Sequence, residues 1–204
     1  MNKLKKFWIY CFIICFSLIP ILFISIPFYL MLLTFLSIIF ICLKFKLQKF
    51  PIFLFIVSLV IRIIFNIIIK TPPVSDFDVL LNASRSLLGG DTSFNNSTYF
   101  NLWAYQIGFV TYQTLLLKIC NSVFFLKIVN CIISSSICVL IYLISKEFVK
   151  EKSAQIVSII YSFLVFTISY TSVLSNQHIS TFLIYLSLYI LIAKKLKLEK
   201  VINI

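Results

Sequence analysis

Long uninterrupted apolar runs are the feature that most constrains how this chain can fold. Two of them, residues 51–69 and 124–145, are close to the length that a helix needs to cross a bilayer, about 20 residues. The apolar stretch 7–43 is too long for one span, and Pro20 and Pro27 favour a turn within it. With 61% hydrophobic and 12% charged residues, the chain has too little polar surface for a water-soluble globule.

The runs predict an all-α fold, a polytopic transmembrane helical bundle of about six spans. The expected spans lie near residues 7–24, 26–43, 51–69, 124–145, 154–172 and 179–193. We divide the chain accordingly into spans 1–3 (residues 1–70), an extracytoplasmic loop (71–123), and spans 4–6 with a basic tail (124–204). The lysine-rich start resembles a signal peptide, but its apolar run continues without a small-residue cleavage site, which favours a retained first span.

Basic residues fall mainly in short clusters between the apolar runs. Clusters at residues 3–6, 44–49, 146–152 and 194–200 all lie on one side of the predicted membrane, whereas the other side holds little beyond Lys70 and Arg85. The positive-inside rule then predicts a multi-pass protein of the cell membrane with a cytoplasmic N-terminus. The net charge of +12 is explained by this distribution, and no basic patch with interleaved aromatics indicates a nucleic-acid partner.

The six cysteines indicate neither a disulfide framework nor a metal site. Nearly all lie inside apolar runs, and none forms a CxxC pair. We therefore interpret them as small apolar side chains.

The polar segment between spans 3 and 4 contains all three aspartates of the chain, Asp76, Asp78 and Asp91. Residues 75–90 have apolar side chains at helical spacing and predict an amphipathic helix lying in the membrane interface. Asp78 fits a capping box with Ser75, and Asp91 beside Gly90 fits a turn. Asp76 has two open interpretations, a helix-dipole partner in the first turn or a base facing a cavity.

Several short motifs in this order resemble GT-C glycosyltransferases. The closest branch is family 39, related to protein O-mannosyltransferases and to bacterial RgtA/B/C/D-like enzymes. The resemblance rests on the segments 72–77 (PPVSDF), 87–91 (LLGGD), 99–108 (YFNLWAYQIG) and 175–178 (SNQH). Members are typically longer, so the resemblance implies that this chain corresponds to the N-terminal portion of such an enzyme.

The resemblance implies an inverting hexosyltransferase that works on the extracytoplasmic side of the bilayer. Its donor is a sugar linked to polyprenyl phosphate, and its acceptor is a hydroxyl of a glycan, lipid or protein. Asp76 matches the family's catalytic base, which takes the proton from the acceptor hydroxyl. No organic cofactor is implied, and a requirement for a divalent metal stays open.

Six further residues are candidates for substrate binding: Arg62, Arg85, Trp103, Tyr105, Gln177 and His178. A phosphate leaving group needs cations or hydrogen-bond donors, which the arginines, His178 and Gln177 could supply. Arg62 lies within span 3, where a charge is costly and indicates function, unless it snorkels to the interface. Trp103 and Tyr105 fit either sugar stacking or an interfacial aromatic belt, and His178 also fits an exposed polar turn.

An alternative function is a non-catalytic membrane subunit, or a protein that binds or transports lipid-linked sugars. A transporter is expected to have polar residues deep within several spans. Charge within the predicted spans is almost limited to Arg62, which favours chemistry at the membrane face.

Overall fold

The computed structural model describes residues 49–202, so predicted spans 1 and 2 lie outside the described residues. Residues 47–204 form one compact unit. Every regular element in the described part is a helix, which confirms the all-α prediction there. The elements are α3 (Phe50–Ile68), α4 (Asp76–Leu88), η1 (Ser93–Asn96), α5 (Thr98–Leu102), α6 (Gln106–Ile119), α7 (Val123–Ser145), α8 (Glu151–Ser162), α9 (Val165–Ser169), η2 (Tyr170–Ser172) and α10 (Gln177–Ile202).

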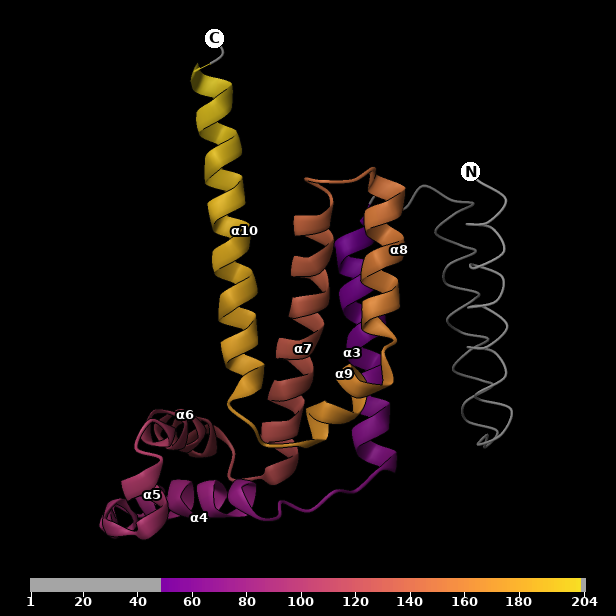
Figure 1. Ribbon diagram of the computed structural model, residues 1–204. Helices are drawn as coiled ribbons and strands as arrows, with labels where there is room; N and C mark the ends of the chain where they lie inside the picture. The colour runs from indigo at the N-terminus through magenta and orange to yellow at the C-terminus, as the bar shows by residue number, and fades with distance from the viewer. Residues whose placement is uncertain (1–48, 203–204) are drawn as a thin grey trace, which may run out of the picture. The chain divides into compact units, whose positions relative to one another are not determined.

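Helices α3 and α7 are long and apolar enough to cross a membrane. Their bounds agree with predicted spans 3 and 4 to within a residue or two. Helix α7 packs against α3, α8 and α10, so it is the central helix of this unit (Figure 1). The outward face of α3 presents apolar side chains such as Ile56, Val60 and Ile64, as expected for a surface in contact with lipid.

Predicted span 5, residues 154–172, consists of two helical segments with a break between them. Helix α8 ends at Ser162, and the segment Val165–Ser172 continues at an angle of 57° to it. Ser158 and Ser162 each turn a hydroxyl back onto a carbonyl three residues earlier. Such bonds compete with the helical pattern and promote bends. The bent pair forms either one broken span or a re-entrant segment.

The prediction of six spans is only partly supported. Residues 49–202 contain two clear candidate spans, or three if the bent pair counts as one. The apolar part of α10, Gln177–Ala193, covers predicted span 6 but is shorter than a full span. The chain is therefore a membrane protein by the length and composition of these helices.

Helices α4, α5 and α6, which we call the platform, lie beside the end of the bundle at which α3 ends and α7 begins, with α4 running crosswise to α7 (Figure 1). Leu80 and Ala83 of α4 pack on Phe109 and Val110 of α6. Ser84, the one polar residue on the apolar face of α4, is buried, and its hydroxyl donates to Gln113 Oε1 at 3.0 Å. The amphipathic helix predicted at residues 75–90 is present as α4, and its apolar residues pack on α6. Its position in the membrane interface stays a prediction.

Helix α4 ends in a Schellman motif built around Gly90. The amide of Gly90 donates to the Leu87 carbonyl at 3.0 Å, and the amide of Asp91 donates to the Ser86 carbonyl at 2.9 Å. Gly90 has φ of 86°, which only glycine adopts without a steric cost. This turn redirects the chain from α4 toward α5.

Replacing Gly90 with alanine is expected to destabilise the folded protein by about 1–2 kcal/mol, because a Cβ is strained in the left-handed region. Gly108→Ala is the matched control. Gly108 lies inside α6 with open space around its Cα, so alanine there is expected to be neutral or stabilising by up to about 1 kcal/mol. Thermal unfolding of both variants in detergent measures the difference, and equal midpoints would contradict the assignment.

Candidate functional site

Two of the motifs that resemble GT-C glycosyltransferases come together at the platform end of the bundle, the segment 99–108 and the turn 175–178. The amide of Asn176, in the turn before α10, donates to Gln106 Oε1 at the start of α6, at 3.2 Å. Beneath this bond, Leu174 packs with Leu81 of α4 and Leu126 of α7. The 99–108 segment and the 175–178 turn therefore meet at the same end of the helices, as predicted.

Asp76 is the first residue of α4 and is exposed. Within residues 49–202 its carboxylate makes no hydrogen bond and no ion pair. Burial raises the pKa of the Tyr99 phenol, and the negative charge of Asp76 raises it further. The two side chains are therefore close enough to interact electrostatically. A carboxylate in this position is favoured by the helix dipole and remains free to accept a proton.

The backbone directly before Asp76 is strained. Ser75 has φ of 54° and ψ of −134°, the one positive φ of a non-glycine residue in the described part of the chain. Such a conformation costs roughly 1–3 kcal/mol and occurs most often where function demands it. It turns the chain from the Pro72–Pro73 segment into α4 and so fixes where Asp76 begins the helix.

The predicted capping box is wrong. The Ser75 side chain makes no capping hydrogen bond, and the Ser75 carbonyl instead accepts from the amides of Asp78 and Val79. The positive φ of Ser75 replaces the extended conformation that a capping serine normally has. The carboxylate of Asp78 accepts from Asn82 Nδ2 at 3.1 Å, one turn along the exposed face.

Asp91 forms the turn that the sequence predicts. Its Oδ1 accepts from the Ser93 amide at 2.8 Å, and its Oδ2 accepts from the Ser93 hydroxyl at 2.9 Å. These bonds lower the pKa of the Asp91 carboxyl, the backbone amide having the larger effect. Both oxygens of Asp91 are thus engaged locally, unlike those of Asp76.

Arg85 does not approach Asp76. Both side chains are exposed on α4, but they are nine residues apart, which corresponds to about 13 Å along the helix axis. Nine residues also place them on opposite sides of the helix. Arg85 thus lies on the face of α4 opposite to Asp76, and its role in binding a donor phosphate stays a prediction.

Trp103 and Tyr105 form an exposed aromatic pair just after α5. Their ring centroids are 6.0 Å apart and the rings are perpendicular. Trp103 is 47% exposed and Tyr105 is 66% exposed. Both interpretations from the sequence, an interfacial belt and a sugar-stacking surface, are compatible with rings displayed in this way.

Gln177 and His178 differ in their surroundings. His178 is buried, contrary to the interpretation as an exposed polar turn, and its Nε2 lies 3.1 Å from the Tyr170 carbonyl oxygen. Gln177 is exposed, and its Oε1 accepts from the Tyr170 hydroxyl. Both residues line a cavity of about 130 Å³ together with Tyr161 and Thr181.

Arg62 is fully buried in the bundle core, which corrects the snorkelling interpretation. Its Nε donates to the Ser134 hydroxyl at 2.9 Å, and its two terminal nitrogens donate to the Ser162 carbonyl and the Thr167 hydroxyl, both at 3.2 Å. Ser162 ends α8, and Thr167 lies in α9. Arg62 therefore bridges the break between these helices and supplies donors for a carbonyl that the break leaves free.

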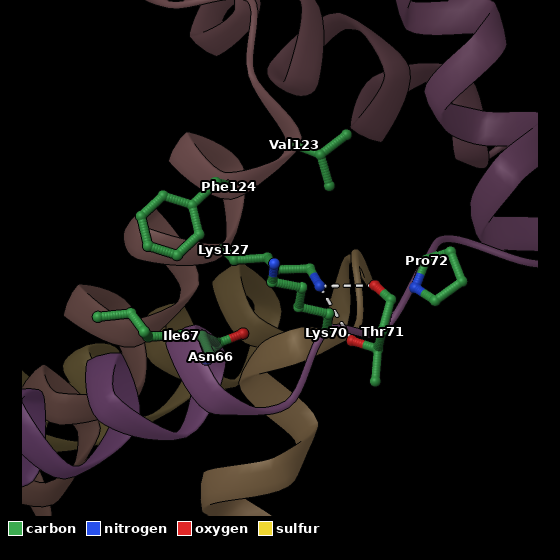
Figure 2. Close-up of a pocket in the computed structure, with 8 residues that line it drawn as sticks. All are labelled: Asn66, Ile67, Lys70, Thr71, Pro72, Val123, Phe124 and Lys127. Carbon is green, nitrogen blue, oxygen red and sulfur yellow. Dashed lines mark hydrogen bonds between the residues drawn. The ribbon is translucent and has the colours of Figure 1, made fainter.

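A pocket of about 550 Å³ opens where the C-terminal end of α3 meets the N-terminal end of α7 (Figure 2). Lys70 and Lys127 supply its charge, and none of the described residues that line it is acidic. Lys127 is only 5% exposed, and its Nζ donates to the carbonyl oxygen of Thr71 at 2.7 Å and to the Thr71 hydroxyl at 2.9 Å. The remaining lining residues are Asn66, Ile67, Pro72, Val123 and Phe124.

Lys127 was overlooked in the sequence analysis, as was Lys118 at the end of α6. The expectation that charge within the spans is almost limited to Arg62 is thus wrong. A lysine four residues inside an apolar run of spanning length is itself a signal, because ionisable residues are rare at such positions. What the sequence could not supply is its partner, Thr71, which lies 56 residues earlier.

The pocket and Asp76 lie close together along the chain. Pro72 lines the pocket, and Asp76 follows it four positions later, so their Cα atoms are at most about 14 Å apart. A cationic pocket with apolar walls and an unbonded carboxylate thus share the platform end of α3 and α7.

Comparison with known proteins adds no relative to these observations: the chain matches no protein-family model, no curated protein and no solved structure.

Proposed function

We propose that this chain is, or forms part of, a membrane glycosyltransferase that uses a polyprenyl-phosphate-linked sugar. The observation that carries the proposal is the carboxylate of Asp76, exposed and unbonded within the described residues, four positions along the chain from Pro72, which lines a pocket with two lysines and apolar walls. Such a pocket suits a donor whose phosphate is anionic and whose tail is apolar. The carboxylate suits the activation of a hydroxyl.

In the proposed reaction, the acceptor oxygen attacks the anomeric carbon of the donor sugar. The new carbon–oxygen bond forms as the bond from that carbon to the phosphate oxygen breaks, which inverts the configuration. Asp76 takes the acceptor proton, and the polyprenyl phosphate leaves with the bonding electron pair. Lysine ammonium groups stabilise the charge that develops on the phosphate.

The acceptor in this proposal is a hydroxyl of a glycan, a lipid or a protein. We assign Trp103 and Tyr105 to stacking on the acceptor, a role supported by the exposure of both rings. Gln177 and His178 belong to a separate cavity, and we assign them no contact with the donor phosphate.

The topology of the proposal is tested by labelling a cysteine at position 76. In a background without other cysteines, Asp76→Cys is expected to react with a membrane-impermeant maleimide added to intact cells. A cysteine in place of Lys150, in the connection between α7 and α8, is the control and is expected to react only after permeabilisation. Labelling of position 76 from the cytoplasmic side alone would exclude an extracytoplasmic reaction.

A second candidate function is the binding or transport of a lipid-linked sugar without catalysis. It is favoured by the polar residues buried in three helices of the bundle, Arg62 in α3, Asn130 in α7 and Gln155 in α8. Polar groups deep in several spans are typical of transport proteins. Binding of the donor without any turnover under all acceptor conditions would favour this function over the first.

A further inference from the structure

The Lys127 side chain is held in place but keeps hydrogen-bonding capacity. An ammonium group has three N–H donors, and Thr71 accepts two of them, one at its carbonyl oxygen and one at its hydroxyl. Thr71 is neutral, and no carboxylate lines the pocket, so the charge of Lys127 has no counter-ion there. A buried cation in this state gains strongly from an anion that reaches its third donor.

Lys70 adds a second cation to the same pocket. It follows the C-terminal end of α3 and is exposed, whereas Lys127 is buried, so the two differ in mobility. Two like charges in one pocket repel each other. An anion between them is attracted to both, and these two attractions outweigh the repulsion. The N-terminal end of α7, with its partial positive charge, contributes in the same direction.

The walls of the pocket select the kind of anion. Ile67 is 56% exposed and Phe124 is 47% exposed, so an apolar surface continues outward from the lysines. Both residues belong to the two helices that are candidate membrane spans, so a lipid tail in the bilayer can reach their exposed sides. A soluble anion gains nothing from this surface, whereas a lipid tail does.

We propose that the pocket binds the phosphate headgroup of an anionic isoprenoid lipid through Lys70 and Lys127, with the first isoprene units against Ile67 and Phe124. A zwitterionic headgroup is disfavoured, because the described lining residues offer its ammonium group two cations and no carboxylate. The choice of an isoprenoid rests on the proposed function. The requirement for a phosphate with a tail rests on the pocket alone.

The test is a binding titration of the full chain in detergent, read by native mass spectrometry with farnesyl phosphate as the probe. Lys127→Met and Lys70→Ala are each expected to weaken binding by about tenfold or more, because each removes a charge-assisted hydrogen bond. Lys127→Arg, which keeps the charge, is expected to stay within a fewfold of the unmodified protein. Lys118→Ala is the matched control, an exposed lysine of the platform outside the pocket, and is expected to bind normally.

Three comparison ligands separate the contributions. Farnesol lacks the phosphate, dodecylphosphocholine is zwitterionic, and inorganic phosphate lacks the tail; each is expected to bind at least about tenfold more weakly than farnesyl phosphate. Equal binding of farnesol, or binding that is insensitive to both lysines, would overturn the proposal. Inorganic phosphate binding as tightly as farnesyl phosphate would also overturn it, in favour of a site for soluble anions.

The outcomes also distinguish the proposal about the pocket from the proposal that the protein is a glycosyltransferase. If Lys127→Met fails to fold, Lys70→Ala and Lys127→Arg still decide the lysine dependence. Lysine-dependent binding, together with no sugar transfer in membranes that contain the complete enzyme, supports the pocket and refutes the glycosyltransferase. Sugar transfer that depends on Asp76, together with lysine-independent binding, supports the enzyme and refutes the pocket.

Discussion

Replacing Asp76 with asparagine is expected to lower sugar transfer by at least about 100-fold, because a positioned general base contributes about 10²–10⁴ to the rate. Asparagine has nearly the same shape as aspartate but cannot accept the proton of the acceptor hydroxyl. The side chain is exposed and unbonded within the described residues, so its loss is not expected to disturb the platform. The measurement is transfer from a polyprenyl-phosphate-linked sugar in membranes that contain the complete enzyme.

Asp78→Asn is the matched control for this experiment. Asp78 is also an exposed carboxylate in the first turn of α4, two residues away, but it is bonded to Asn82. We expect the Asp78 variant to keep transfer within a fewfold of the original rate, and Asp76→Glu to recover part of the activity. Equal membrane insertion of all three variants must be shown by their amounts in the membrane fraction. An unchanged rate in Asp76→Asn would remove Asp76 from the mechanism.

Replacing Arg62 with methionine is expected to cause a large loss of stability, of the order of 3 kcal/mol. Methionine fills much of the volume but leaves the Ser162 carbonyl and the hydroxyls of Ser134 and Thr167 without the donors of Arg62. Each buried polar group that loses its partner costs about 1–3 kcal/mol. For a chain of this size, we expect the unfolding midpoint in detergent to fall by roughly 5–10 °C.

Two further variants show whether this loss comes from the hydrogen bonds of Arg62. Arg62→Lys keeps the charge but lacks the planar fork, so it is expected to be intermediate in stability. Ile64→Ala removes an exposed apolar side chain from the same helix and is expected to change the midpoint little. A midpoint for Arg62→Met as high as that of Ile64→Ala would show that Arg62 does not stabilise the break between α8 and α9.

The sequence by itself determined the helical elements with the strongest local signals. The runs that became α3 and α7 have the length and the apolar content of membrane spans, and these properties do not depend on neighbours. Helix α4 was also predictable, because prolines precede it, Gly89 and Gly90 end it, and its apolar face has helical spacing. The turn at Asp91 followed from local side-chain bonding in the same way.

Only the tertiary structure decided where the polar groups of the spans are placed. Arg62 reaches residues 72 to 105 positions away, and Lys127 reaches back 56 positions to Thr71. The break after Ser162 depends on these contacts, because a membrane-buried carbonyl needs a donor from another helix once its own helix ends. Such hydrogen bonds form only when the helices pack together. The periodicity of apolar residues along one segment therefore does not predict them.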